Sequence, residues 1–308
     1  MKKIWKLLKA HLRDDFKITE YGLTAILLAV AIAVNYHYDV EDSILDELTG
    51  WKKFFGYYFF YCVPYYLTLL IFKRPDPQNF WFQKSFWLRS QIGLLILTLD
   101  VSVPFLNSLI EENSAEELHY WLYKIIVNGI SLVTVFVPLM IAYFLMDRRE
   151  GHLYGLAPKK FDVKPYFTML LIMLPLLITA SFHRSFLRQY PMYNTSDAHT
   201  YLGVPDWVTA MGYEFAYGFD FITLELLFRG FMVLAIAHLV GRRAVLAMAV
   251  IYCFLHFGKP MGEAISSIFG GYILGVISLE TRSVWGGIIV HLGIAWLMEL
   301  IGYIQQIT

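Results

Sequence analysis

The stretch FITLELLFRGFMVLAIA (221–237) decides the fold, because it is apolar almost throughout and yet carries Glu225 and Arg229. It belongs to a longer apolar run over 207–239, and crossing a bilayer takes about 20 such residues. A charge at the bilayer centre costs at least about 2.5–3.5 kcal/mol, so these two side chains need a partner or a purpose. Because they are four residues apart, they share one helix face and can pair there. The stretch therefore predicts a membrane-spanning helix with an internal ion pair.

Eight further runs are mostly apolar, so the sequence predicts an all-α polytopic bundle of eight or nine membrane spans. These runs lie at 20–36, 54–72, 90–109, 120–146, 165–182, 243–257, 262–280 and 284–304. The run over 207–239 is too long for one straight crossing. It either tilts, or consists of a surface helix over 206–219 followed by the span proper. The run over 243–257 is short and ends at Gly258 and Pro260, which are stop signals.

The composition excludes several classes of protein. Of the 308 residues, 57% are hydrophobic and 16% are charged, whereas a soluble domain has about 45–50% and about 25%. This excludes a disordered, a collagen-like and a nucleic-acid-binding chain. The 25 basic residues balance the 25 acidic ones, so no overall field recruits a polyanion. The two cysteines, Cys62 and Cys253, lie in apolar runs and form neither a disulfide framework nor a zinc knuckle. We therefore expect the lipid bilayer, and no nucleic acid, as a partner.

The charge of the loops predicts the orientation. Residues 1–17 form a basic, amphipathic segment, which we interpret as an interfacial helix on the cytoplasmic face. With a cytoplasmic N-terminus and nine crossings, eighteen Lys and Arg residues lie on the cytoplasmic side and five on the other. Such an excess is typical of cytoplasmic loops. We expect an integral membrane protein whose N-terminus is cytoplasmic.

A polar hinge, GHLYGLAPKKFDVK (151–164), divides the chain. Before it, the spans are aromatic and are expected to hold almost no buried ionisable group. After it, they carry glutamate, arginine, histidine and clustered glycine. We therefore take 1–150 as the N-terminal amphipathic segment with supporting helices, and 151–308 as the functional core.

His256 ends a short apolar run in YCFLHFGKP (252–260), just before a break that frees backbone groups and admits water. Taken alone, such a histidine is more often a satisfied polar tip than a functional group. Glu263 follows three residues beyond Pro260. It either favours the positive end of the next helix dipole or lies near His256 across the break.

His291 lies within the apolar run WGGIIVHLGIA (285–295) and has no charged neighbour in the sequence. An imidazole at this depth needs a partner on another helix. Glu299, eight residues further on, is either that partner or an interfacial anchor.

A stripe of small residues recurs every four positions between the two histidines: Ser267, Gly271 and Gly275. Such a stripe lets two helix backbones approach closely. We expect it to draw the helices of His256 and His291 together.

One carboxylate, one arginine and two histidines on three spans form a stronger pattern than any of them alone. Two imidazoles and a carboxylate can activate a water, or bind a divalent metal such as zinc, with His256, His291 and Glu225 as candidate ligands. The sequence leaves open whether a metal is bound. An arginine can steady a carboxylate or stabilise an oxyanion. At membrane depth, such groups fit peptide hydrolysis near the bilayer interface, or the movement of protons or ions.

Three motifs in this order resemble the CAAX protease and bacteriocin-processing (CPBP) family: ELLFRG (225–230), YxxxH (252–256) and HxxxA (291–295). The resemblance covers roughly residues 150–304, and GLAPKK (155–160) looks like the family's lead-in. The family, also called the abortive-infection family, consists of intramembrane proteases related to the type II CAAX prenyl endopeptidase. The resemblance implies a hydrolase of a bacterial cytoplasmic (inner) membrane that cleaves a membrane-anchored or lipidated protein or peptide.

The family pattern reads EExxxR, then FxxxH, then HxxxN. It implies that the first glutamate and the first histidine activate water, while the second histidine and the asparagine stabilise the oxyanion. By this resemblance, Glu225 and Arg229 form a bracing pair. His256 is the water activator or a ligand, and His291 is the oxyanion donor or a ligand.

Two expected groups are absent, because Leu224 stands at the first glutamate and Ala295 at the asparagine. A general base is worth about 10²–10⁴-fold in rate, and one oxyanion donor about 10²–10³-fold. Rotation of the helix, or recruitment of Glu263, would restore a carboxylate beside His256. We expect an endopeptidase, with two alternatives open: a silent pseudoprotease that acts as a membrane binding or chaperone-like module, and a proton or ion pathway through the same groups. The substrate and the oligomeric state stay open.

Overall fold

The structure is a computed structural model that describes residues 2–72, 79–103, 106–157 and 161–307. All regular elements within these ranges are helices. Seven helical segments in the described chain are long and apolar enough to cross a membrane: Ile18–Tyr38, Gly50–Ile71, Glu116–Asp147, Lys164–Ser181, Asp206–Val240, Met261–Thr281 and Trp285–Ile307. The predicted all-α polytopic bundle is therefore confirmed.

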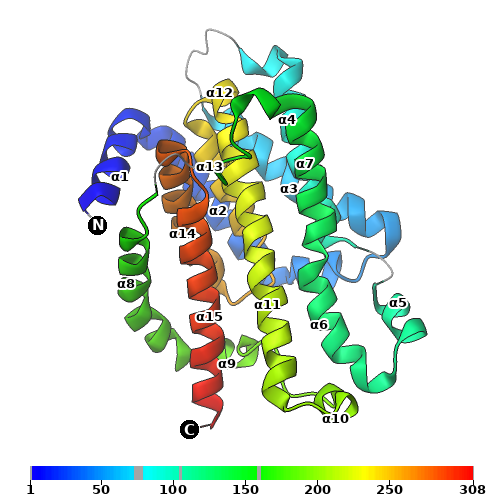
Figure 1. Ribbon diagram of the computed structural model, residues 1–308. Helices are drawn as coiled ribbons and strands as arrows, with labels where there is room; N and C mark the ends of the chain where they lie inside the picture. The colour runs from blue at the N-terminus through cyan, green and yellow to red at the C-terminus, as the bar shows by residue number, and fades with distance from the viewer. Residues whose placement is uncertain (1, 73–78, 104–105, 158–160, 308) are drawn as a thin grey trace.

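The chain runs back and forth through one bundle (Figure 1). Its N-terminal half consists of α1 (Lys2–Asp15), α2 (Ile18–Tyr38), η1 (Glu41–Leu45), α3 (Gly50–Ile71), η2 (Phe80–Phe82), α4 (Lys84–Val101), α5 (Leu106–Asn113), η3 (Glu116–Leu118), α6 (His119–Gly129), η4 (Leu132–Phe136), α7 (Val137–Ala142), η5 (Tyr143–Asp147) and η6 (Arg148–Glu150). Its C-terminal half consists of α8 (Lys164–Ser181), α9 (Arg184–Gln189), α10 (Ala198–Leu202), α11 (Asp206–Glu225), η7 (Leu226–Ala235), α12 (Ala237–Val240), α13 (Arg243–Phe254), α14 (Met261–Thr281) and α15 (Trp285–Ile307).

The long sixth run forms one continuous helical segment from Asp206 to Val240. The α-helix α11 passes directly into the π-helix η7, and all ten residues of η7 are buried. Figure 1 shows the two as a single inclined rod. Of the two predicted arrangements, the structure has the tilted span and not a separate surface helix.

The predicted span at 90–109 is wrong in its bounds, since α4 covers Lys84–Val101. Two of the predicted residues, 104 and 105, lie outside the described residues. The apolar pattern fails here because α4 contains Arg89, which is buried and pairs with Asp147 at 2.6 Å. Tyr154 donates a second hydrogen bond to Asp147 at 2.9 Å. The helix therefore extends through a charge that is neutralised from another helix.

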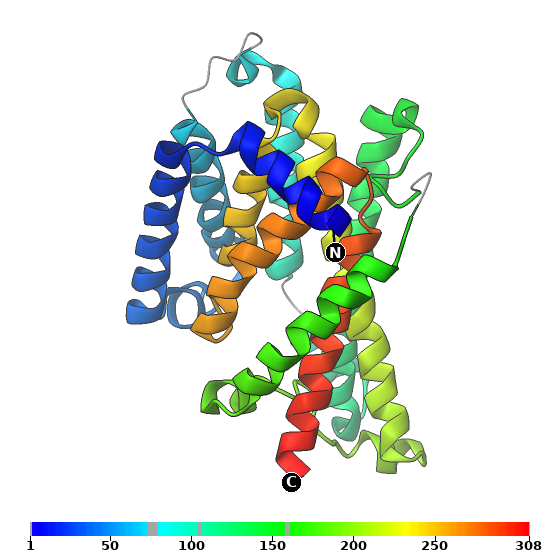
Figure 2. The same ribbon diagram turned by 90° about the vertical axis from the view of Figure 1, so that its left-hand side faces the viewer.

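The expectation that the spans before the hinge hold almost no buried ionisable group is also wrong, since Glu20 on α2 is buried as well as Arg89 and Asp147. In addition, the helix α1 buries His11, which lies 3.0 Å from Arg242. Arg242 in turn pairs with Glu280 on α14 at 2.7 Å. Burial lowers the pKa of His11. The N-terminal helix is amphipathic, as predicted, but its inner face is docked on α14 through these polar groups (Figure 2).

The stripe of small residues on α14 packs against α13. A Cβ added to Gly271 would meet the ring of Tyr252, and one added to Gly275 would meet Met248 and Val245. The stripe thus brings α14 close to the helix that precedes His256. It does not face α15, which diverges from α14 as the two helices leave their connecting turn (Figure 2).

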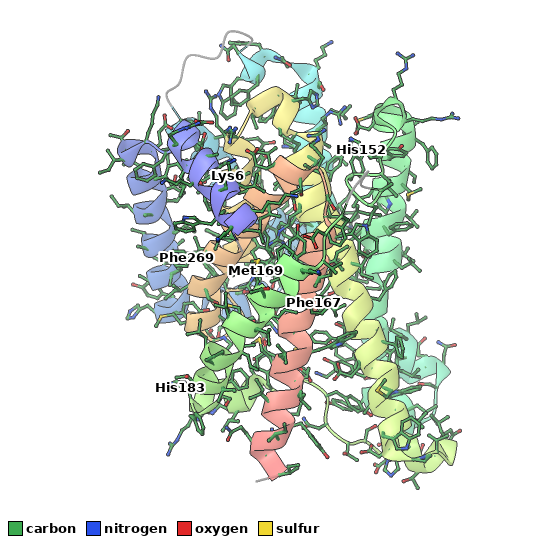
Figure 3. The ribbon with its side chains drawn as sticks, turned by 60° about the vertical axis from the view of Figure 1, so that its left-hand side comes forward. Lys6, His152, Phe167, Met169, His183 and Phe269 are labelled. Atoms are coloured by element: carbon green, nitrogen blue, oxygen red, sulfur yellow. The ribbon has the colours of Figure 1, made fainter. Side chains whose placement is uncertain are left out.

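The outer faces of α8 and α14 carry exposed apolar side chains. Phe167 on α8 is 56% exposed and Phe269 on α14 is 65% exposed (Figure 3). Backbone polar groups at these depths are satisfied within helices, as a hydrocarbon environment requires. This distribution is typical of a surface in contact with lipid, so the chain is an integral membrane protein.

Candidate active site

The predicted ion pair lies where α11 passes into η7. Glu225 and Arg229 are both fully buried, and Glu225 Oε1 lies 2.8 Å from Arg229 Nη1. The Arg229 guanidinium also lies 4.2 Å from the ring centroid of Tyr252 on α13. The guanidinium nitrogens of Arg229 have no acceptor with hydrogen-bond geometry among the described residues. The Glu225 carboxylate and the Tyr252 ring face therefore balance its charge.

His291 has two hydrogen-bond partners on other helices, as its depth in the bundle requires. Its Nδ1 lies 3.0 Å from Glu225 Oε1, and its Nε2 lies 3.0 Å from the Tyr252 hydroxyl. A carboxylate only accepts, so Nδ1 carries the proton, and Nε2 accepts from the hydroxyl. Glu225 thus fixes both the tautomer and the orientation of His291.

His256 lies one residue beyond the capping residue of α13, in the loop over 255–260. Its Nδ1 donates to the backbone carbonyl of Tyr252 at 2.8 Å, which leaves Nε2 as an acceptor. The ring centroids of His256 and Tyr252 are 4.6 Å apart. Because Tyr252 also contacts His291, with ring centroids 5.7 Å apart, it lies between the two imidazoles.

Tyr252 is a site residue that the motif comparison does not identify, since the family pattern FxxxH has phenylalanine at this position. The residue links every other member of the site. The hydroxyl binds His291, the ring faces Arg229, and the carbonyl holds His256. The four-residue spacing of YxxxH, which places both side chains on one face of a helical turn, is the signal that could have found it.

Two further carboxylates that the sequence suggested as partners of the histidines are engaged elsewhere. Glu263 accepts from the Tyr190 hydroxyl at 3.0 Å, and Glu299 accepts from the backbone N–H of Met192 at 2.9 Å. Glu299 is therefore not the partner of His291 but anchors the segment after α9. The contacts of Glu263 do not include His256, and its recruitment as a base stays a prediction.

The two replaced positions lie among apolar and aromatic side chains. Leu224 is half-buried and packs on the main apolar core. Ala295 is 5% exposed and lies in a cluster with aromatic side chains of α11 and the segment after α9: Tyr193, Tyr213, Tyr217 and Phe221. Glu225, which stands at the second glutamate of the family pattern, contacts Arg229 and His291.

The side chains present do not fit a divalent metal. No three His, Cys, Asp or Glu side chains gather closely enough to hold a metal ion anywhere in the described ranges. Glu225 and His291 are in contact, but Tyr252 separates them from His256. A catalytic zinc needs three protein ligands, and these side chains do not supply them together.

The match to a known family coincides with this geometry. Residues 198–297 match the family described as Type II CAAX prenyl endopeptidase Rce1-like, so this part of the chain is similar to a CAAX-type intramembrane protease family. The matched range contains all five residues of the site: Glu225, Arg229, Tyr252, His256 and His291. No curated protein and no solved structure matches the chain. The resemblance inferred from the three motifs is confirmed.

The contact between α15 and Glu225 depends on Gly287. A Cβ added there would overlap Glu225 Oε2. We expect Gly287→Ala to lower the free energy of unfolding by about 1–3 kcal/mol, as overpacking does. Thermal unfolding in detergent measures this, with Gly270→Ala as the control, because nothing lies within 4 Å of a Cβ at Gly270. Equal unfolding temperatures for the two variants would contradict the close approach.

Proposed function

We propose that this membrane protein, similar over residues 198–297 to a CAAX-type protease family, is an intramembrane endopeptidase. Its substrate would be a peptide bond in a membrane-anchored or lipidated protein or peptide. The observation that carries the proposal is the continuous set of partly buried contacts from Glu225 through His291 and Tyr252 to His256. We further propose a bacterial cytoplasmic membrane with the N-terminus in the cytoplasm.

His291 is the general base in this proposal. Arg229 pairs with Glu225, and Glu225 accepts from Nδ1 of His291. Nε2 of His291 is then free to take the proton of an attacking water, as in other carboxylate–histidine pairs. His256 Nε2 accepts a hydrogen bond from the same water and orients it. The hydroxide adds to the carbonyl carbon of the substrate and forms a tetrahedral oxyanion.

The Tyr252 hydroxyl is the oxyanion donor. It lies against His291 in the structure and can turn to the oxyanion when the water replaces it at Nε2. Collapse of the intermediate breaks the C–N bond, and His291 returns its proton to the leaving amine. The products are a carboxylic acid and an amine, so atoms and charge balance without a cofactor.

The pseudoprotease alternative rests on Leu224 and Ala295, which remove one carboxylate and one amide from the family pattern. In that case the polar set would be a structural clamp, and the chain would bind membrane proteins without cleaving them. The two functions differ in whether a product forms.

The test is a quantitative profile of membrane-protein N-termini in cells that express the wild type or His256→Ala at matched levels. New termini that require His256 are expected, because the variant lacks the group that orients the water. His37→Ala is the matched control, since His37 is exposed at the end of α2. Identical profiles from folded, inserted wild type and His256→Ala would overturn the endopeptidase and support the pseudoprotease.

A further inference from the structure

The last turn of α2 and the segment that follows it are bound to the loop over 255–260, which carries His256. Asn35, which is 3% exposed, donates to the carbonyl of Phe257 at 3.2 Å. Tyr36 donates to the carbonyl of Lys259 at 2.6 Å and lies 3.4 Å from that of His256. The carbonyls of His256, Phe257 and Lys259 thus all face the last turn of α2. These contacts are formed by residues outside the family match, which begins at residue 198.

Glu41, the first residue of η1, completes this attachment. Its backbone N–H donates to Asn35 Oδ1 at 3.1 Å. The backbone N–H of Gly258 lies beside the Glu41 carboxyl group. A Cβ added to Gly258 would come within 3.3 Å of Glu41 Oε2 and 3.2 Å of Asp42 Oδ1, so the loop and η1 are in close contact. The Asn35 side chain therefore links Glu41 to the loop, because its oxygen accepts from the Glu41 N–H and its nitrogen donates to the Phe257 carbonyl.

We infer that Asn35, Tyr36 and Glu41 are positioning residues for His256, and that Glu41 makes their hold on the loop depend on pH. The catalytic meaning of this inference rests on the proposed function. The attachment of the loop does not depend on the proposed function, because it concerns only the contacts between the loop and the N-terminal helices. It also gives the N-terminal helices, which carry no motif, a part in the site.

Several ionisable groups face Glu41. Asp42 and Asp46 lie on its own turn, Lys259 lies on the loop, and three tyrosines come from the flanking spans: Tyr36, Tyr57 and Tyr61. Burial, followed by Asp46 and Asp42, raises the pKa of Glu41 to about 8, against the opposing effects of the Gly258 N–H and Lys259. The closed arrangement therefore contains the neutral carboxyl group.

The direction of the pH effect follows from this shift. When the turn opens to water, Glu41 recovers a pKa near its ordinary value of 4.5 and loses its proton. Opening is thus coupled to proton release, and it becomes easier as the pH rises from 4.5 to about 8. The loop is held most firmly in acid and most loosely at and above pH 8.

Hydrogen–deuterium exchange of the backbone over 255–260, in detergent at pH values from 5 to about 8, tests the inference. Comparison of wild type with Glu41→Gln at each pH cancels the intrinsic pH dependence of exchange. The glutamine keeps an acceptor for Gly258 but cannot ionise. Glu47→Gln is the matched control, because Glu47 is exposed on the same turn.

We expect similar exchange in wild type and Glu41→Gln near pH 5. Toward pH 8 the wild type should exchange at least about tenfold faster than the variant, because a one-proton linkage allows up to tenfold per pH unit. Tyr36→Phe should raise exchange about two- to tenfold relative to Tyr38→Phe, since one hydrogen bond is lost and the Tyr38 ring is exposed. A wild-type to Glu41→Gln ratio that is constant with pH, or a silent Tyr36→Phe, would overturn the inference.

The exchange readout separates this inference from the proposed function. If the wild type forms no cleavage product, the endopeptidase fails while the exchange still decides whether the turn holds the loop. If a product forms, Asn35→Ala should lower kcat more than it changes KM, because the substrate contacts remain. The pH profile of kcat should also change in Glu41→Gln and not in Glu47→Gln.

Discussion

Glu225→Gln is expected to lower the free energy of unfolding by about 3–5 kcal/mol, since it leaves a buried arginine without its counter-charge. Arg229 is fully buried, and its only charged neighbour at ion-pair distance among the described residues is Glu225. The same change removes the acceptor of His291 Nδ1. We therefore expect cleavage to be lost together with stability. Denaturant-induced unfolding in mixed micelles measures the stability directly.

A double-variant cycle separates the charge from the packing. Glu225→Gln combined with Arg229→Met removes both charges, and it should recover most of the lost stability, because a buried pair can often be replaced by apolar groups. It should not recover cleavage. The exposed pair of Arg13 and Asp14 gives the control, since Arg13→Gln should cost at most about 1 kcal/mol. Wild-type stability of Glu225→Gln would show that the pair does not balance a buried charge.

Tyr252→Phe is expected to lower kcat by about 10²–10³-fold, the effect of removing one oxyanion donor. KM should change little, because the phenyl ring keeps the packing against Arg229 and His256. Tyr65→Phe is the matched control, since Tyr65 is fully buried and its hydroxyl has no hydrogen-bond partner within the described chain. Cleavage of a substrate identified by the terminus profile provides the assay.

The family pattern suggests a rescue of this variant. It has phenylalanine at position 252 and asparagine at position 295, whereas this chain has tyrosine and alanine. Ala295 lies one helical turn from His291, so an asparagine there projects on the same face. Tyr252→Phe combined with Ala295→Asn should recover at least about tenfold of the lost kcat. Full activity of Tyr252→Phe alone would show that the hydroxyl is not the donor.

Much of the site was accessible from local sequence. The pairing of Glu225 with Arg229 follows from their four-residue spacing, and the need of His291 for an interhelical partner follows from its depth. The order of the three motifs identified the family resemblance. What local sequence did not supply was the identity of that partner. The sequence suggested Glu299 as a candidate, whereas the packing of α15 on α11 through Gly287 selects Glu225.

By itself, the sequence determined most of the helical spans and the pairing of Glu225 with Arg229, because each depends on spacing along one helix or on the cost of charge in lipid. The tertiary structure alone decided which groups meet across helices. It placed Tyr252 between the two histidines, carried α4 through the paired Arg89, and brought Glu41 to the loop of His256. Contacts between residues more than 200 positions apart, such as Asn35 and Phe257, leave no periodic signal in the chain, since they depend on how whole helices pack.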